Sequence, residues 1–171
     1  MLIYHPAYDL NHCVFRVLSL LTTSAHKQFD TDLLRLMDFY VLFPHLLKTI
    51  RPLPVALKEY RIIIKNIPSA YEAIPNPKRI LFDLEEVQNA AFHNLLAREI
   101  LDLDAFRSNL VTLNDSALPS DFRDQLIDNE LANSDWFPLI SNELPLVEFL
   151  GKDGLKKRSS LMEYRYDSTN K

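Results

Sequence analysis

Glycine is the scarcest feature of this chain. The 171 residues include only two glycines, Gly151 and Gly154, so residues 1–150 contain none. Loops that bind phosphate need glycine where backbone N–H groups approach the ligand closely. The sequence therefore has neither a P-loop nor a dinucleotide-binding fingerprint. We expect no nucleotide cofactor here, and any nucleotide chemistry to belong to a partner.

Cysteine and metal-ligand patterns are equally sparse. The single cysteine, Cys13, cannot form an internal disulfide, which suits a reducing compartment, and we interpret it as a buried apolar residue. The five histidines form no His-x-x-x-His pair and no Cys/His cluster, so we expect no metal site. No serine has the flanking glycines of a nucleophile elbow. We expect no enzymatic activity and name no catalytic residue.

One acidic cluster needs an explanation of its own. Asp83, Glu85 and Glu86 could form a carboxylate pair or hold a metal ion. We place them at the start of a helix, where acidic side chains compensate the helix dipole, and favour that structural role.

Long apolar runs are also missing. Residues 1–6 lack the basic and apolar regions of a signal peptide, so none is expected. No run approaches the roughly 20 apolar residues of a membrane-spanning helix. We therefore expect a cytoplasmic protein.

The residues that are present predict an ordered, mainly α protein. The chain is 47% hydrophobic and contains ten Phe and seven Tyr, too many aromatic residues for a disordered chain. Residues 1–150 are expected to form a single compact helical domain, and residues 151–171 a basic C-terminal tail. A chain of this length can bury about 70% of its unfolded surface without disulfides.

The first half of the chain predicts three helices. Asp9 or Asn11 can cap a helix over residues 9–22, and Asp30 or Thr31 can cap the next. Residues 33–43 are apolar on nearly every side, which is typical of a buried central helix that Pro44 ends. A third helix is expected over residues 55–67. The core residues predicted here are Leu36, Phe39, Tyr40, Leu42 and Phe43.

The second half predicts a small β element among further helices. Residues 78–82 are interpreted as a short strand, and Asp83 as the cap of a helix that reaches about Glu99, with Glu86 in a variant of the capping box. The remaining expectations are an irregular connection at 68–78, extended segments at 100–103 and 110–113, and helices at 119–133 and 135–150. The second of these helices is expected to be interrupted near Pro138 and Pro145. This order is compatible with a winged-helix-like module over residues 79–118, with its β element around 79–113, although a clear helix-turn-helix is lacking.

Charge is distributed unevenly. Residues 45–80 carry a net charge of +5, residues 81–150 one of −11 and residues 151–171 one of +3. Such asymmetry indicates separate faces for separate partners, and solvated helix faces explain any single block equally well. The helix starting at Leu84 has an acidic start that phosphates would repel, so the basic stretch 48–65 and Lys156-Lys157-Arg158 are better candidates for phosphate contact.

The tail is the candidate partner-binding surface. The two glycines precede it, so it can leave the core, and its arginine and aromatic content is typical of interface anchors. A solvated terminus is the alternative. If the tail proves necessary for folding, its residues belong to the core instead. The residues predicted to contact a partner subunit, or DNA held by it, are Lys156, Lys157, Arg158, Tyr164, Arg165 and Tyr166.

Several sequence islands carry a family resemblance. They are Leu2-Ile3-Tyr4-His5-Pro6-Ala7-Tyr8-Asp9, His12-Cys13-Val14-Phe15-Arg16, Leu36-Met37-Asp38-Phe39-Tyr40-Val41-Leu42-Phe43-Pro44, Gly154-Leu155-Lys156-Lys157-Arg158 and Leu161-Met162-Glu163-Tyr164-Arg165-Tyr166. Together they resemble the middle-component proteins of bacterial ABC-type three-component systems, the class that includes Lamassu anti-phage defence. The islands span nearly the whole chain and contain no catalytic signature.

The resemblance implies a function and partners. It implies a non-enzymatic adaptor that binds an ATPase of the structural-maintenance-of-chromosomes type and helps to control an effector, often a nuclease. It assigns a chemical role to no residue. Two alternatives stay open: a stand-alone winged-helix regulator that binds DNA, and a small hydrolase with dispersed catalytic residues.

Overall fold

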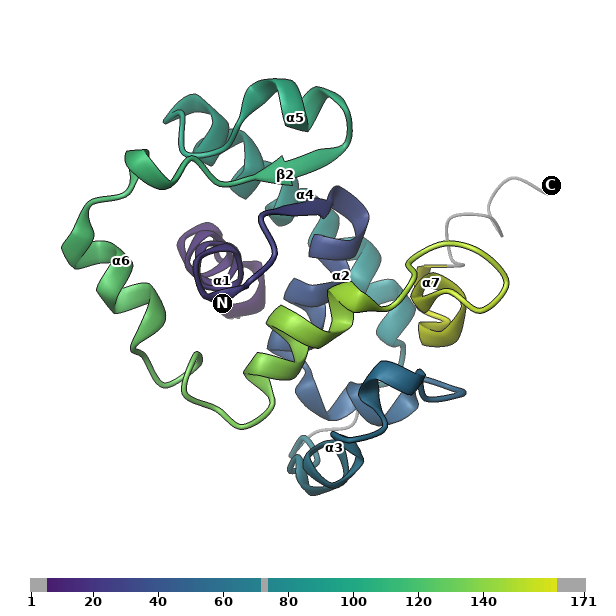
Figure 1. The fold of residues 1–171 in the computed structure, drawn as a ribbon. Coiled ribbons are helices and arrows are strands. Elements are labelled where there is room, and N and C mark those ends of the chain that lie inside the picture. The colour runs from purple at the N-terminus through teal and green to yellow at the C-terminus, as the bar shows by residue number, and fades with distance from the viewer. Residues whose placement is uncertain (1–5, 72–73, 163–171) are drawn as a thin grey trace, which may run out of the picture.

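The computed structural model describes residues 6–71 and 74–162, and it confirms a mainly α fold with one two-stranded sheet (Figure 1). The α-helices and strands, in chain order, are α1 (Leu10–Thr23), β1 (Gln28–Asp30), α2 (Thr31–Leu42), α3 (Arg61–Asn66), α4 (Pro77–Ala97), α5 (Leu103–Arg107), β2 (Leu110–Thr112), α6 (Ser120–Ile127) and α7 (Leu155–Ser159). The 3-10 helices are η1 (Pro6–Tyr8), η2 (Pro44–Thr49), η3 (Val55–Leu57), η4 (Asp115–Ala117) and η6 (Leu144–Leu146), and η5 (Leu139–Glu143) is a π-helix. None of the helices in the described residues combines the length and hydropathy needed to cross a bilayer.

Helix α1 lies at the centre of the arrangement and packs against α2, α4 and α6 (Figure 1). The predicted cap is confirmed, because the Asp9 side chain accepts a hydrogen bond from the backbone N–H of His12 at 2.9 Å. The buried side of the helix includes Cys13, Val17 and Leu20, which recur at helical spacing. The pattern in this segment alone therefore sets both the start of the helix and the side that faces the core.

Helix α2 is the buried central helix that the sequence predicts. Its side chains Leu36, Phe39 and Tyr40 are fully buried. Leu42 and Phe43, also predicted in the core, are half-buried and pack against it. Pro44 ends the α-helix, as expected, and begins the 3-10 helix η2.

The cap of α2 provides a first testable prediction. Asp30 Oδ1 accepts hydrogen bonds from the N–H groups of Asp32 at 2.8 Å and Leu33 at 3.1 Å, and Asp30→Ala removes both. We expect a loss of about 1 kcal/mol in the free energy of unfolding, measured by urea denaturation. Asp30→Asn retains an acceptor and should stay close to wild type. An equal loss in both variants would show that the carboxylate's charge, not the cap, stabilises the helix start.

The predicted helix over residues 55–67 is broken into two pieces. The 3-10 helix η3 and helix α3 are separated by a turn that begins at Lys58. Within this turn the Tyr60 hydroxyl donates a hydrogen bond to Glu143 at 2.8 Å, which connects the segment to η5. The side chains of Leu57, Ile64 and Ile67 are buried, as the helical spacing predicts. The chain is nevertheless not one continuous helix, and the Tyr60–Glu143 contact lies at the break.

The predicted strand at 78–82 is wrong, because these residues belong to α4. Asn76 caps the helix by accepting a hydrogen bond from the N–H of Arg79 at 3.1 Å. Pro77 occupies the first helical position, where its fixed φ fits and its missing N–H costs nothing. Asp83 lies inside the helix, so its predicted role as cap and the capping box with Glu86 are also wrong.

The sheet joins distant parts of the chain. Strand β2 occupies the predicted extended segment at 110–113, and it pairs antiparallel with β1, placing Phe29 opposite Val111, both buried. A single bridge between Leu101 and Leu113 extends this edge. Only β2 therefore lies within the predicted β element at 79–113. Its partner strand, β1, comes from residues 28–30.

The last part of the predicted domain is less regular than expected. Helix α6 ends at Ile127, before the expected end at 133. The segment 135–150 is interrupted as predicted, and it contains the short helices η5 and η6 in place of α-helix. Pro138 precedes η5 and Pro145 lies within η6, so the two prolines interrupt a regular α-helix as their sequence positions suggest.

The start of the C-terminal tail folds back onto the domain instead of leaving it. The N–H groups of Leu155 and Lys156 donate to the carbonyl oxygens of Glu148 at 2.7 Å and Phe149 at 3.0 Å. Gly154 makes this return turn feasible, because a Cβ atom there would collide with the carbonyl oxygen of Leu150. The glycine thus serves a tight turn, and the expectation that it releases the tail is wrong for residues 154–162.

Candidate functional site

A basic groove of about 1100 Å³ opens on the surface of the domain. It lies between η2, the segment that follows η2, and the elements η3 and α3. The residues that line it are Leu47, Lys48, Ile50, Arg51, Pro52, Leu53, Lys58, Arg61, Ile64 and Lys65. Five of these ten side chains are cationic and none is acidic, so the lining agrees with the predicted basic stretch 48–65.

The cations divide into one structural residue and four rim residues. Lys48 is half-buried, and its Nζ donates to the carbonyl oxygen of Ile67 at 2.5 Å, just after α3 ends. Arg51, Lys58, Arg61 and Lys65 are exposed, and within the described residues their side chains form no ion pair. These four charges remain available for a ligand.

The floor of the groove is apolar. Leu47, Ile50 and Ile64 are buried beneath the charged side chains, and Leu53 is half-buried. No aromatic residue lines the groove. The site therefore combines an apolar floor with a positively charged rim.

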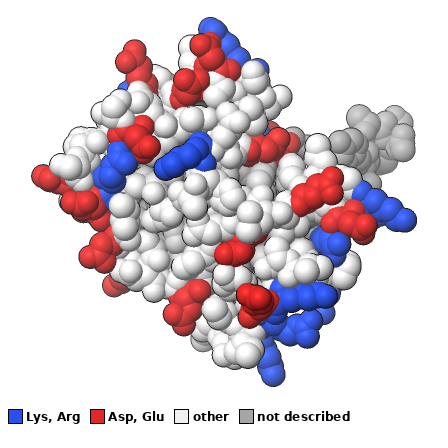
Figure 2. Space-filling model, viewed as in Figure 1, with Lys and Arg blue, Asp and Glu red and all other residues white. Residues whose placement is uncertain are grey.

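The basic C-terminal helix α7 adjoins this groove. The N–H of Arg51 donates to the carbonyl oxygen of Arg158 at 3.1 Å, and Nη1 of Arg158 donates to the carbonyl oxygen of Pro52 at 2.7 Å. Two basic segments separated by almost 100 residues are thus side by side. Figure 2 shows Lys and Arg gathered on the lower right of the molecule, near α3 and α7, with Asp and Glu spread over much of the remaining surface.

The predicted contact residues of the tail have different environments. Arg158 is occupied within the chain, since it also donates to the carbonyl oxygen of Asp153 and lies 3.8 Å from that residue's carboxylate. Lys157 is exposed and Lys156 is half-buried. Tyr164, Arg165 and Tyr166 lie outside the described residues. Within the described residues, the proposed contact surface is therefore represented by the two lysines that precede Arg158 in α7.

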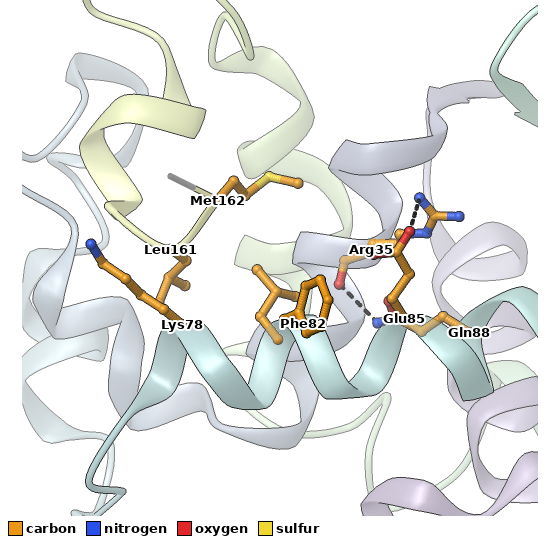
Figure 3. Close-up of a pocket in the computed structure, with 8 residues that line it drawn as sticks. Arg35, Lys78, Phe82, Glu85, Gln88, Leu161 and Met162 are labelled. Carbon is orange, nitrogen blue, oxygen red and sulfur yellow. Dashed lines mark hydrogen bonds and ion pairs between the residues drawn. The ribbon is translucent and has the colours of Figure 1, made fainter. Parts of the chain in front are cut away.

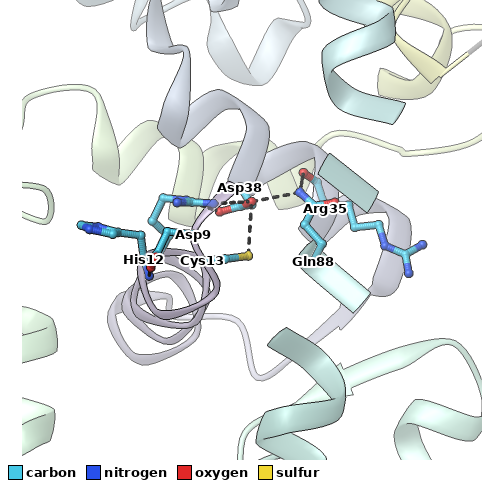
Figure 4. A network of polar contacts seen from close by, with 7 residues as sticks. Asp9, His12, Cys13, Arg35, Asp38 and Gln88 are labelled. Carbon is cyan, nitrogen blue, oxygen red and sulfur yellow. Dashed lines mark hydrogen bonds and ion pairs between the residues drawn. The ribbon is translucent and has the colours of Figure 1, made fainter. Parts of the chain in front are cut away.

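A buried polar network connects α2 with α1 and α4 (Figure 4). Asp38 is fully buried and accepts hydrogen bonds from Arg16 Nε at 2.6 Å, Arg16 Nη2 at 3.2 Å and Gln88 Nε2 at 2.9 Å. The Cys13 thiol lies 4.0 Å from Asp38 Oδ2. One carboxylate thereby joins α1, α2 and α4.

The protonation chemistry of this network is that of a structural element. Burial, followed by the nearby charge of Asp38, raises the pKa of the Cys13 thiol, so this thiol is protonated and unreactive at neutral pH. Burial lowers the pKa of Arg16, but the charge and hydrogen bonds of Asp38 outweigh it and leave the pKa raised. These shifts favour a neutral thiol beside a charged guanidinium.

Gln88, a member of this network, also lines a small pocket (Figure 3). Its volume of about 30 Å³ suffices for a water molecule or two. Lys78, Phe82 and Glu85 line it along α4, and Leu161 and Met162 close it from the C-terminal segment. The pocket is therefore too small to bring a substrate to Asp38.

A polar cleft of about 460 Å³ surrounds the outer end of Arg35. The guanidinium lies 3.0 Å from Asp32 and 3.9 Å from Glu85, donates to Asn89, and covers the ring of Phe92 at 5.7 Å. Its charge is already matched by these neighbours. Among the described residues no three His, Cys, Asp or Glu side chains are grouped so as to hold a metal ion.

The acidic cluster at 83–86 has a different role from the predicted one. Asp83 lies 3.6 Å from Arg79 on the same face of α4, and Glu85 approaches Arg35. Helix α4 begins six residues before Asp83, and its first turn has no acidic residue. Dipole compensation is thus wrong as the explanation, because the effect is confined to the first turn.

The sequence analysis missed the Asp38 network, although it contains a signal. Asp38 is the only charged residue between Leu36 and Phe43. Arg16 lies among the buried residues of α1. Two opposite charges inside buried helices predict a buried pair, because an unpaired charge in such positions is costly.

The comparisons with known proteins give one positive result. A family model described as ABC-three component (ABC-3C) system Middle Component 5 matches residues 2–167. No curated protein and no solved structure matches the chain. The matched range covers nearly the whole chain, including both basic segments and the buried network.

Proposed function

Because this chain belongs to the ABC-three component system Middle Component 5 family, we propose that it is the non-enzymatic adaptor subunit of a bacterial three-component assembly. The observation that carries the proposal is the extent of the family match, over residues 2–167. A component of a multi-component system acts through contacts with the other components. The function is therefore sought in its surfaces.

The finer assignment follows the resemblance described above. In this proposal the partners are an ATPase of the structural-maintenance-of-chromosomes type and an effector such as a nuclease, and the assembly is a Lamassu-like anti-phage system in the cytoplasm. The scarcity of glycine supports this division of labour, because the nucleotide chemistry then belongs to the ATPase. The adaptor's role is to bind the ATPase and control the effector.

The test is reconstitution with the two other components of the same system. We expect affinity-tagged chain, co-expressed with them, to elute with the ATPase in a defined ratio at about 150 mM salt, where nonspecific charge contacts are largely screened. Deleting the chain from the system should abolish protection in a plaque assay. Assembly and full protection by the other two components alone would refute the adaptor role, as would catalytic turnover by the isolated chain that a point mutation in it abolishes.

A further inference from the structure

We propose that the basic groove is the docking site for an acidic, amphipathic segment of another subunit in the assembly. The proposal deepens the adaptor function and rests on it, since it names the chemistry of the partner's contact segment. It concerns the surface formed by η2, η3 and α3, together with the adjoining lysines of α7.

The apolar floor and the charged rim together select the occupant. Pro52, which is exposed, and Leu53, which is half-buried, give the floor its accessible apolar surface over the buried Leu47, Ile50 and Ile64. The rim consists of Arg51, Lys58, Arg61 and Lys65. A segment with apolar residues on one side and carboxylates on the other matches both parts. Apolar side chains gain by leaving water over the floor, and the rim cations gain opposite charges. A ligand that is only apolar or only anionic matches one part and leaves the other unpaired.

Two exposed apolar residues lie close in sequence to the groove lining. Val55 in η3 is 78% exposed and Ile62 in α3 is 71% exposed. Val55 precedes the groove-lining Lys58 by three residues, and Ile62 lies between the groove-lining Arg61 and Lys65. Where an amphipathic helix binds in a groove, it inserts its apolar side, and exposed apolar residues near the groove suit such a ligand. The volume of about 1100 Å³ also exceeds the 300–1000 Å³ typical of small-molecule pockets.

Nucleic acid fits the groove less well. A phosphate backbone would pair with the rim, but it would place charge over an apolar floor that offers no hydrogen bond. Unpaired bases need aromatic side chains on which to stack, and the groove has none in its lining. A bound phosphate would therefore contact only the rim cations, and the apolar floor would contribute nothing to its binding.

A second copy of the chain also fits less well. One acidic amphipathic element in the described residues is α6, with Asp121 and Asp124 on its surface and Asp128 as its C-cap. Its apolar side is already used, because Leu126 is buried and Phe122 packs against the core beneath it. Ile127, 46% exposed, is the main apolar side chain that α6 has left to offer. Helix α6 thus offers the groove little apolar surface, and the proposal assigns the acidic segment to another subunit.

Photo-crosslinking in the co-expressed complex tests the occupant directly. Lys65→p-benzoyl-phenylalanine places the cross-linker on the rim, and Lys27→p-benzoyl-phenylalanine, on an exposed residue before β1, is the control. We expect the Lys65 position to capture a peptide of another subunit that is rich in Asp and Glu, with Leu, Ile or Phe at helical spacing. Capture of DNA, of a second copy, or of a neutral or basic peptide would overturn the proposal.

Charge reversal measures how far binding depends on the rim. We expect Arg61→Glu with Lys65→Glu to weaken binding of the ATPase or effector at least about 10-fold, mainly through slower association at low salt. The matched control, Lys27→Glu with Arg98→Glu, makes the same change in net charge at exposed positions outside the groove and should bind as wild type. Arg61→Lys with Lys65→Arg should also bind as wild type. All variants should retain the wild-type melting temperature.

The two proposals fail in different ways. If the wild-type assembly forms and the rim reversal binds with unchanged affinity, the groove is not the docking site and the adaptor function stands. If the wild-type chain binds neither component, the adaptor function fails and the docking proposal with it.

Discussion

Asp38→Ala is expected to lower the free energy of unfolding by about 3–5 kcal/mol, as removal of one partner of a buried ion pair generally does. The substitution leaves the guanidinium of Arg16, which is 6% exposed, without its counter-charge. It also removes one acceptor of Gln88 Nε2, which lies between α2 and α4. Urea denaturation followed by circular dichroism measures the loss.

Two control variants separate charge from packing. Asp38→Asn keeps the size and one acceptor, so it should lose nearly as much as Asp38→Ala if the charge on Arg16 is what matters. The double variant Arg16→Met with Asp38→Leu removes both charges and should be more stable than either Asp38 single variant, because no uncompensated charge remains. A loss below about 1 kcal/mol in Asp38→Ala would contradict the buried pair.

The central helices could be predicted because their signals are local. Asp9 and Asp30 each precede a helix by one position, and their caps depend on N–H groups two or three residues away. The apolar stretch of α2 is likewise contained within a dozen residues. Such interactions are encoded in a short window, and the structure places them where the sequence indicates.

The errors arise where a local pattern has two interpretations or where the deciding contact is distant. Residues 78–82 fit a short strand by composition, and the deciding signal was the Asn76-Pro77 pair just before them, which caps and begins α4. The pairing of Phe29 with Val111 is a contact between segments far apart in the chain, and one sequence does not reveal it.

The candidate site shows the same division. The basic stretch 48–65 was visible as a run of charge, and so were the lysines of α7. Their adjacency depends on the hydrogen bonds that join Arg158 to Arg51 and to Pro52, which no periodicity predicts. The apolar floor was visible only as residues assigned to a helix. The groove is thus a tertiary feature built from segments that could be predicted separately.

Deleting residues 155–171 is expected to have the largest effect, because it removes part of the core. The side chains of Leu155, Leu161 and Met162 are 0%, 5% and 7% exposed. Loss of a buried Leu or Met side chain costs about 2–5 kcal/mol, and a domain of this size has roughly 5–15 kcal/mol of stability in total. The truncated chain should therefore melt far below wild type or lose its cooperative transition in differential scanning calorimetry.

The matched variant for this deletion keeps the core and changes only the surface. Lys157→Glu reverses an exposed charge in α7 and leaves Leu155, Leu161 and Met162 in place, so its melting temperature should equal that of wild type. Reduced binding of a partner by this variant would then report a contact through α7, whereas the deletion would lose binding through unfolding. A truncated chain that melts as wild type does would show that these three side chains add little to the core. The start of the tail would then act as a separable contact segment, because its removal would leave the rest of the domain intact.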